Sequence, residues 1–256
     1  MPFLTYTKFR IPGGDSLVAE INENLEIKYA EPPNNKWLYV LKPLLSAPGH
    51  ETSMWGQILE KPDTILIFTE WKDQPWYNSF RDSKEYTDVY WPALSIVDVP
   101  SVQTAFYPSI ANLHHLIPMF KYFTIITCYF PSSISEERIR QISSGKFSGL
   151  HMKSRGGKSG LSNVHVDRPH YHMPARMWAL DPEERSGLQM KALLWLHFWK
   201  DPESEEQFMR RKRSVGVYGD ESLPVKEEFE QRLRRHECQE IVEEHIYLVG
   251  INLGDV

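Results

Sequence analysis

The feature that most constrains the fold of this chain is a repeat between its two halves. Residues 71–80 read WKDQPWYNSF and residues 199–208 read WKDPESEEQF, so Trp-Lys-Asp and a Phe nine positions after the Trp recur 128 residues apart. An apolar run precedes each copy, and a Met-Trp pair lies upstream of each run, beginning at residue 54 and at residue 177. Four landmarks in the same order predict that one structural unit occurs twice.

Each half shows the same predicted order of elements. An aromatic and β-branched stretch, Phe3–Arg10 or 121–130, has the composition of an opening strand. A helical pattern, a pair of strands, a second helix and a closing strand follow, and Asp201 and Pro202 suit the start of the second helix in the later copy. This order predicts an α+β fold of two tandem ferredoxin-like (βαββαβ) repeats, each an antiparallel sheet with helices on one face.

The two repeats are predicted to span residues 1–112 and 119–256, with a His- and Gly-rich insertion at about 144–173. Because one face of each sheet lacks helices, we expect the repeats to cover each other and form a barrel. With 8 Trp, 12 Tyr and 12 Phe, the chain can line such a barrel with aromatic side chains, which favour large apolar ligands. The candidates for this substrate-binding wall, with core packing as the alternative role, are Trp55, Phe106, Tyr129, Trp178 and Trp195.

Several residues of the first half resemble the antibiotic biosynthesis monooxygenase (ABM) family, which has the dimeric α+β barrel fold. They are Gly56, Glu60, Pro62, Asp63, the IFTEW segment that ends at Trp71, Phe80, Ser83 and Tyr86. The resemblance covers about residues 40–107, and over 121–251 only the framework of elements is similar. It implies a fused version of the barrel within one chain. It transfers no catalytic residue, because the family lacks a sharp catalytic signature.

The resemblance also implies a kind of chemistry. Members of the family act on polycyclic or aromatic small molecules, often polyketides or terpenoids, and usually use no metal, flavin or nicotinamide. Some insert oxygen, whereas others decarboxylate, dehydrate, isomerise or cyclise their substrates. The related chlorite dismutases and dye-decolourising peroxidases bind haem, but this chain lacks a GxxDG-like segment similar to that of the peroxidases. We therefore expect a protein without a cofactor.

Composition and motif content argue against several other classes of protein. The net charge of -5, from 29 basic and 34 acidic residues, disfavours general nucleic-acid binding. The two cysteines lack zinc-finger or disulfide-framework spacing, and P-loop, GxGxxG, GxSxG and HExxH segments are absent. No apolar run reaches the length of a membrane span, and the N-terminus has no signal-peptide core. The sequence predicts a cytoplasmic protein, compatible with a homodimer, without nucleic-acid or membrane partners.

The insertion at about 144–173 concentrates polar side chains. Its second part contains His165, Asp167, Arg168, His170, Tyr171 and His172. Loops of this length inside a compact domain are usually functional or disordered. One interpretation is a lid whose histidines act beside Asp167 as general acids or bases, while Arg168 and Tyr171 contact the substrate. A metal site around His170 and His172, and a solvated loop without such a role, are the alternatives.

His197 is the remaining candidate for acid–base chemistry. It lies on the same face of its predicted strand as Trp195 and Trp199. If that face lines the cavity, His197 is a buried imidazole suited to proton transfer. If that face packs in the core, His197 is a hydrogen-bonded core histidine, and the sequence leaves both interpretations open.

Together these patterns favour a cofactor-independent tailoring enzyme of secondary metabolism. The aromatic cavity would hold a hydrophobic polyketide- or terpenoid-like substrate in a reactive conformation. The histidines would then promote cyclisation, isomerisation or C–C lyase chemistry. One alternative is a cofactor-free monooxygenase of an aromatic or polycyclic substrate, and another is a metabolite-binding protein without catalytic activity.

Overall fold

The chain divides into two compact units, and each is described by itself. The computed structural model describes residues 3–10, 36–95, 103–108, 122–144, 175–210 and 224–251. The first unit contains the residues up to Met119 together with the C-terminal segment from Glu244, and the second contains most residues from Phe120 to Glu243. Strand β9 (Glu240–Tyr247) therefore begins in the second unit and ends in the first.

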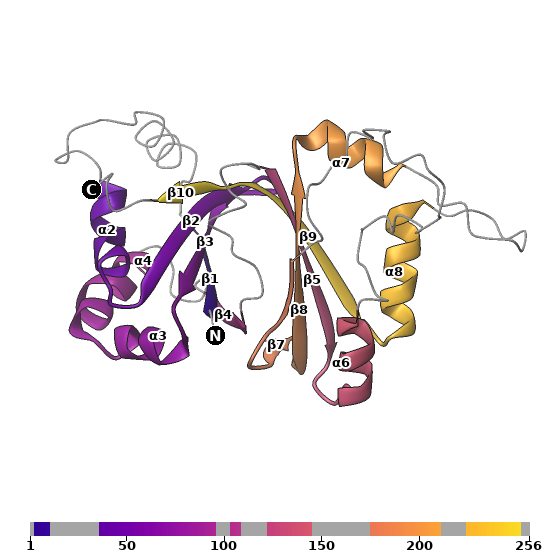
Figure 1. Cartoon of the computed structure of the whole chain (residues 1–256), viewed down its shortest axis with the longest axis horizontal. Helices are drawn as coiled ribbons and strands as arrows, with labels where there is room; N and C mark the ends of the chain where they lie inside the picture. The colour runs from indigo at the N-terminus through magenta and orange to yellow at the C-terminus, as the bar shows by residue number, and fades with distance from the viewer. Residues whose placement is uncertain are drawn as a thin grey trace, which may run out of the picture. The chain divides into compact units, whose positions relative to one another are not determined.

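The first unit is an antiparallel sheet with helices on one face (Figure 1). Its strands follow the order β4–β1–β3–β2, and β10 pairs with β2. The strands are β1 (Phe3–Arg10), β2 (His50–Ile58), β3 (Lys61–Trp71), β4 (Gln103–Pro108) and β10 (Val249–Ile251). The helices are α2 (Lys36–Leu45), α3 (Gln74–Arg81), the π-helix η2 (Glu85–Tyr90) and α4 (Trp91–Ser95).

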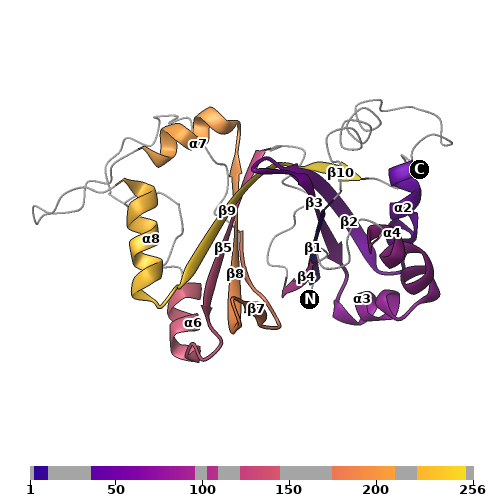
Figure 2. The same cartoon turned by 180° about the vertical axis from the view of Figure 1, so that it is seen from behind.

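The second unit has the same layered construction, with its helices on one side of the sheet (Figure 2). Its strands follow the order β9–β5–β8–β6, and the short strand β7 pairs with β8. The strands besides β9 are β5 (Tyr122–Pro131), β6 (Ala175–Trp178), β7 (Glu183–Arg185) and β8 (Leu188–Trp199). The helices are α6 (Glu136–Ser143), α7 (Pro202–Met209) and α8 (Val225–Arg235).

The two units repeat the same local interactions around the Trp of the WKD triplet. Trp71 donates from its Nε1 to Thr5 Oγ1 on the neighbouring strand at 3.1 Å. Trp199 donates in the same way to Thr124 Oγ1 at 2.8 Å. A tryptophan bonded to the opening strand in both units supports the predicted duplication, and the α+β fold of two tandem ferredoxin-like repeats is confirmed.

The helix after each WKD triplet begins at an aspartate N-cap. The Asp73 side chain accepts a hydrogen bond from the backbone N–H of Trp76 at 3.2 Å, and Asp201 accepts from that of Ser204 at 2.7 Å. Proline follows within the first turn of both helices, where its missing N–H leaves no helical bond unmade. The sequence therefore sets the start of α3 and of α7 locally, which places Phe80 and Phe208 toward their sheets.

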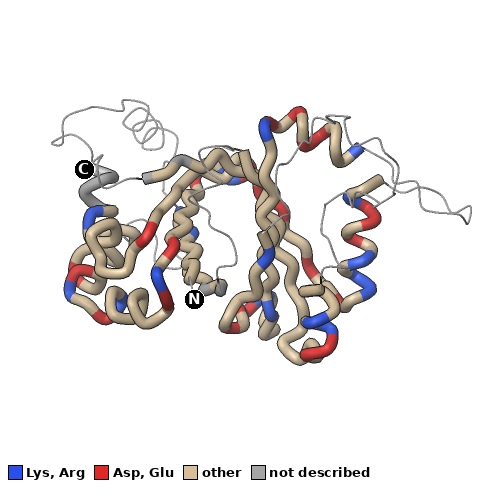
Figure 3. The backbone as a smooth tube through the Cα atoms, in the orientation of Figure 1, with Lys and Arg blue, Asp and Glu red and all other residues tan. Residues whose placement is uncertain are grey.

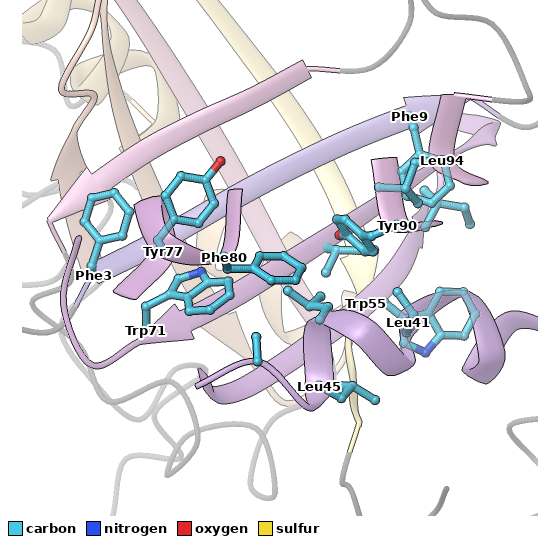
Figure 4. Close-up of a cluster of buried hydrophobic side chains, with 14 residues drawn as sticks. Phe3, Phe9, Leu41, Leu45, Trp55, Trp71, Tyr77, Phe80, Tyr90 and Leu94 are labelled. Carbon is cyan, nitrogen blue, oxygen red and sulfur yellow. The ribbon is translucent and has the colours of Figure 1, made fainter. Parts of the chain in front are cut away.

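The helix-facing side of each sheet holds a separate aromatic core. In the first unit, Trp55 and Trp71 pack with side chains of α2, α3 and the π-helix, as Figure 4 shows. In the second unit, Trp195, Trp199 and Phe229 belong to the corresponding cluster. Fully burying one large apolar side chain stabilises a fold by about 1.5–3 kcal/mol, so these clusters are the main source of stability in each unit.

The central strands are also buried on their other face. In β3, Leu66 and Phe68 are inaccessible to solvent although they point away from the helices. In β8, Leu194 and Leu196 are likewise inaccessible to solvent and point away from the helices. A strand that is apolar on both faces reads as a continuous hydrophobic run, which is the pattern that both segments show in the sequence.

A buried ion pair attaches the C-terminal segment to the first unit. Glu244 of β9 is only 2% exposed, and its carboxylate contacts Lys8 Nζ at 2.7 Å and Lys61 Nζ at 2.9 Å. Burial alone would raise the pKa of Glu244, but the two ammonium groups outweigh this effect and lower it. The last residues of β9 are thus held by charge as well as by strand pairing.

Each helix of the second unit carries both acidic and basic residues or ends beside one, as the red and blue segments of Figure 3 show. Helix α8 has Glu227 and Glu228 in its first turn and Arg232, Arg234 and Arg235 in its last turn, which suits the helix dipole at both ends.

None of the described helices is both long enough and apolar enough to span a lipid bilayer.

Candidate functional site

Six residues of the insertion that the sequence suggested for acid–base chemistry or for substrate contact lie outside the described part of the chain. They are His165, Asp167, Arg168, His170, Tyr171 and His172. Phe106 belongs to β4, but its side chain is likewise outside the description. The roles suggested for these residues stay predictions. Within the described ranges, no group of three His, Cys, Asp or Glu side chains is placed to hold a metal ion.

His197 lies inside the helix–sheet layer of the second unit. It is 3% exposed and stacks between the rings of Trp195 and Trp199, at centroid distances of 6.2 and 6.3 Å. The ring of Phe229 from α8 meets it edge-on at 6.5 Å. The face of β8 that carries His197 therefore packs against the helices. Of the two placements that the sequence left open, the structure has His197 in the core.

The aromatic residues predicted to line one wall are spread over different surfaces. Trp55 is buried in the first core, whereas Trp195 is buried in the second. Trp178 packs on Phe130 and donates from Nε1 to Ser143 Oγ at 2.9 Å. Tyr129 lies on the face without helices, under the Arg185 guanidinium at 4.5 Å from its ring centroid. Trp178 packs against the same helix-facing cluster as Trp195, whereas Tyr129 lies on the opposite face of the second sheet.

A different group of residues surrounds a small space between the sheet and the helices of the first unit. Its sheet side is formed by Thr5 and Thr7 of β1, Thr69 of β3 and Thr104 of β4. Thr5 is opposite Thr69 and Thr7 is opposite Thr104, so the hydroxyls form a polar patch on an otherwise apolar face. The space measures about 10 Å³, which is enough for one water-sized molecule.

The opposite wall of this space is aromatic. Its rings are those of Tyr77, Phe80, Tyr86, Tyr90 and Trp91. Phe80 contacts Tyr86 edge-on at 5.3 Å and Tyr90 at 5.7 Å, and Tyr86 stacks on Trp91 at 5.5 Å. We call the space between the threonines and these rings the first-unit pocket.

A π-helical turn carries two of the three tyrosines. In η2 the backbone N–H of Trp91 bonds to the carbonyl oxygen of Tyr86, five residues earlier. Tyr86 and Tyr90 lie within this turn, and both rings reach the first-unit pocket. The π-helix is a rare conformation that occurs mostly as single turns, frequently at functional sites. Its presence at the aromatic wall marks this wall as a candidate site.

The three tyrosines remain protonated at neutral pH. Burial raises the pKa of Tyr86 to about 12, although the nearby Arg81 and a hydrogen bond with Tyr77 act in the opposite direction. Burial also raises the pKa of Tyr77 and of Tyr90. Protonated phenols donate hydrogen bonds, so this wall can stabilise negative charge on a ligand oxygen and cannot act as a base.

An open groove of about 710 Å³ lies beside the first-unit pocket. Its walls include Lys42 of α2, Ser46 directly after α2, Trp76 and Phe80 of α3, and Val89 of η2. This volume is typical of sites for small-molecule ligands. Phe80 lines both the groove and the first-unit pocket.

Gly49 lies beside Trp76 at the rim of this open groove, which we call the outer groove. Its φ of 79° lies in the left-handed region, and a Cβ atom at this position would stand 2.3 Å from Cγ of Trp76. A larger residue would therefore have both an unfavourable backbone conformation and a clash with the groove wall. The glycine allows the turn before β2 to pass directly under the Trp76 ring.

His50, at the start of β2, connects to the first-unit pocket through hydroxyl groups. Its Nε2 lies 2.9 Å from Ser53 Oγ, and Ser53 Oγ lies 2.9 Å from Thr69 Oγ1. The ring of Trp71 meets the imidazole edge-on at 6.0 Å. Burial lowers the pKa of His50 to about 4, so the ring is neutral at neutral pH.

The lowered pKa of His50 predicts a loss of stability in mild acid. Below its ordinary value of 6.5 the unfolded chain takes up a proton that the folded chain accepts only near pH 4. Stability present above pH 6.5 is therefore lost as the pH falls toward 4, by about 1–2 kcal/mol at pH 5. Urea unfolding at neutral pH and at pH 5 should show a smaller loss in His50→Asn than in the natural chain. An equal loss in both would contradict the assignment.

The second unit fills the corresponding positions with larger or charged side chains. When Trp71 is aligned with Trp199, Thr69 aligns with His197 and Tyr77 aligns with Glu205. His197 stacks against tryptophans, and Glu205 accepts a hydrogen bond from the Thr124 hydroxyl. Thr5 thus keeps a counterpart in Thr124, whereas Thr69 and Tyr77 are replaced, so the complete set of threonines and tyrosines is a property of the first unit.

The comparisons with known proteins support the fold. Neither a protein-family model nor a curated protein sequence matches the chain. A solved structure titled as an anthrone oxidase-like protein superposes with a TM-score of 0.57 at 10% identity, covering 97% of this chain and 91% of the other. A candidate monooxygenase from Fusobacterium nucleatum superposes with a TM-score of 0.50 at 10% identity, covering 98% and 94%. Both similarities extend over the whole chain and establish a shared architecture.

Sequence analysis did not select the first-unit pocket. Phe80 and Tyr86 are part of the family resemblance, and the threonines are not among the residues singled out from the sequence. One signal was present: Thr5 and Thr7 alternate with apolar residues, so both hydroxyls point to the same face of β1. Polar residues on the helix-facing side of a strand indicate either a buried network or a site.

Proposed function

We propose that the chain is an enzyme that binds an aromatic or polycyclic phenolic compound at the first unit and oxidises it with dioxygen. The observation that carries this proposal is the first-unit pocket, where protonated tyrosines face a patch of threonine hydroxyls behind the ring of Phe80. The two structural neighbours, an anthrone oxidase-like protein and a candidate monooxygenase, support the same kind of chemistry.

The outer groove and the first-unit pocket have complementary parts in this proposal. The flat apolar rings of the substrate lie in the groove against Trp76, with the oxygen-bearing edge toward Phe80. Rotation of the Phe80 ring joins the groove to the pocket, and the tyrosine hydroxyls then donate hydrogen bonds to the substrate oxygen. The pocket itself has room for one water-sized group, such as the oxygen atom at the edge of the substrate.

Anthrone, a tricyclic ketone with an acidic CH₂ group, is an example of such a substrate. A base removes one proton of the CH₂ group, and the electron pair of that C–H bond remains as an enolate. The enolate carbon transfers electrons to dioxygen and forms a C–O bond, which gives a hydroperoxide after protonation. Loss of water, with the second C–H proton, forms the new carbonyl group, so anthrone and dioxygen give anthraquinone and water. Tyrosine donors stabilise the enolate oxygen, the type of interaction that contributes most to many enzymatic rates.

Oxygen uptake and product formation with anthrone test this function. We expect the protein to consume one molecule of dioxygen for each anthraquinone formed, at a rate proportional to protein concentration and above that of anthrone in buffer. An oxygen electrode and the absorption spectrum of the quinone measure the two quantities. A rate equal to that in buffer, for both anthrone and a hydroxylated anthrone, would contradict the proposal.

The same assay separates the other two functions that the sequence suggested. Conversion of a polyketide-like substrate under nitrogen would support cyclase, isomerase or lyase chemistry. Binding of anthrone, seen as quenching of tryptophan fluorescence, without any conversion would support a storage protein. The histidines that favoured acid–base chemistry either lie outside the described residues or, for His197, pack in the second core. Oxidation is therefore the function that the described residues support best.

A further inference from the structure

A chain of three hydrogen-bonding side chains leads out of the first-unit pocket. Thr69 lines the pocket and is 2% exposed, and its Oγ1 lies 2.9 Å from Oγ of Ser53, which is inaccessible to solvent. Ser53 Oγ in turn lies 2.9 Å from Nε2 of His50, which is partly exposed. Both distances are those of ordinary hydrogen bonds. A buried wall group is thus connected to the protein surface in two steps.

A β-bulge in β2 brings His50 and Ser53 to the same side of the strand. Residues three apart on a regular strand point to opposite faces, so His50 and Ser53 would not meet. The pairing of β2 with β3 shifts register between His50 and Thr52, which places an extra residue, Glu51, in the strand. The bulge turns His50 to the side of Ser53. Bulges occur often beside active sites, where they redirect a side chain.

The protonation state of His50 gives the chain a direction. Burial holds the pKa of His50 near 4, so at neutral pH the ring has one N–H and one acceptor nitrogen. With the proton on Nδ1, Nε2 accepts from the Ser53 hydroxyl, and Ser53 accepts from the Thr69 hydroxyl. The oxygen of Thr69 then offers its free lone pair to the pocket.

We propose that Thr69, Ser53 and His50 form a proton relay that removes the acidic proton of a substrate bound at the first-unit pocket. This inference rests on the proposed function, because it supplies the base that the protonated tyrosines cannot provide. The substrate C–H bond breaks, and its electron pair stays on the substrate as an enolate. Thr69 takes the proton while passing its own to Ser53, Ser53 passes its own to His50 Nε2, and the imidazolium releases a proton to water.

Comparison with the second unit indicates that this relay is not needed for folding. His197 stands at the position of Thr69, and its ring packs between two tryptophans of the second core. The same sheet layer therefore forms with a different residue at this point. Thr69, the first hydroxyl of the relay, is replaced by a histidine in the second repeat, as expected if only the first repeat performs the function.

Mutation and chemical rescue test the relay. We expect His50→Ala and Ser53→Ala each to lower kcat for anthrone by about 100-fold, with little change in KM. Because His50 is partly exposed, added imidazole should restore activity to His50→Ala. It should not restore Ser53→Ala, in which the connection itself is broken. Thr127→Val, which removes a buried hydroxyl of the second unit, is the matched control and should keep the natural rate.

A merely structural network would give a different pattern. Its disruption would lower the thermal unfolding temperature of both variants without rescue by imidazole, and that result would overturn the relay. A kcat of His50→Ala within about twofold of the natural chain would overturn it as well. These failures differ from a failure of the proposed function, in which the natural chain itself does not oxidise anthrone.

A measurement without substrate tests the direction of the relay independently. The ¹⁵N chemical shifts of His50 report which ring nitrogen carries the proton. We expect the Nδ1–H form in the natural chain, and a change of the tautomer ratio in Ser53→Ala. A predominant Nε2–H form would overturn the relay even if anthrone is oxidised, because Nε2 could then accept no proton.

Discussion

Replacing Tyr86 by Phe should lower kcat/KM for anthrone by about 100-fold, the typical cost of removing one donor to a developing oxyanion. The phenyl ring of Phe retains the contacts of Tyr86 with Phe80 and Trp91, so the loss reports on the hydroxyl group. Tyr77→Phe should have a similar effect, because Tyr77 and Tyr86 are hydrogen-bonded to each other at the same wall. Initial rates of quinone formation measure both variants.

The matched control for these variants is Tyr122→Phe in the second unit. Tyr122 is also a buried tyrosine, at 5% exposure, and belongs to the second core. Its replacement should leave kcat/KM within about twofold of the natural value. Equal losses in Tyr86→Phe and Tyr122→Phe would show that general damage to the protein, and not a missing donor, explains the result.

Replacing Trp71 by Ala should lower the free energy of unfolding by about 3–5 kcal/mol, the range for large-to-small changes in a packed core. Trp71 is fully buried, contacts Tyr77 and Phe80, and donates a hydrogen bond to Thr5. Its removal leaves a cavity under the tyrosine wall and an unsatisfied Thr5 hydroxyl. Urea denaturation followed by circular dichroism measures the loss.

An exposed residue provides the comparison for Trp71. Leu188 is 59% exposed, so Leu188→Ala should change the free energy of unfolding by no more than about 0.5 kcal/mol. A loss below about 1 kcal/mol in Trp71→Ala would mean that the first core is packed far more loosely than the contacts around this ring indicate.

The duplicated fold could be predicted because its signals are local and repeated. The N-cap aspartates and the WKD triplet occur in both halves, and Trp71 and Trp199 make the same hydrogen bond to the opening strand. Such features depend on a few neighbouring residues. They can therefore be recognised in a sequence that is only 10% identical to a solved structure of the same architecture.

The position of the candidate site could not be predicted in the same way. Alternation along β8 showed that Trp195, His197 and Trp199 share a face, but β8 is buried on both faces, so alternation could not say which face meets the helices. The aromatic excess was assigned to a wall between two sheets. The larger described aromatic clusters lie under the helices of each unit, while a smaller set on the helix-free faces includes Tyr6, Phe68, Phe123 and Phe198.

The upstream Met-Trp pairs show a related difficulty. Trp55 is opposite Ile67 in the first unit, whereas Trp178 is opposite Leu193 in the second. With Trp71 aligned to Trp199, Ile67 corresponds to Trp195, whose partner is Arg176 and not Trp178. The pairs are similar in sequence but differ by two residues in strand register. A linear comparison could not detect this shift, because it preserves the face on which each Trp lies.

The relay adds a feature that sequence patterns do not reveal. His50 and Ser53 are three residues apart, a spacing that on a regular strand separates them, and only the bulge at Glu51 brings them to one side. Bulges depend on pairing with the neighbouring strand, so they are invisible in the periodicity of β2 alone.

A crystal structure of the protein with anthraquinone, the expected product, tests the central claim most directly. We predict electron density for the three rings in the outer groove and the first-unit pocket, with the Phe80 ring rotated aside. A carbonyl oxygen of the ligand should lie within hydrogen-bonding distance of the Tyr77 or Tyr86 hydroxyl. Density for the ligand only against residues of the second unit, with the first-unit pocket unchanged, would contradict the claim that the first unit carries the active site.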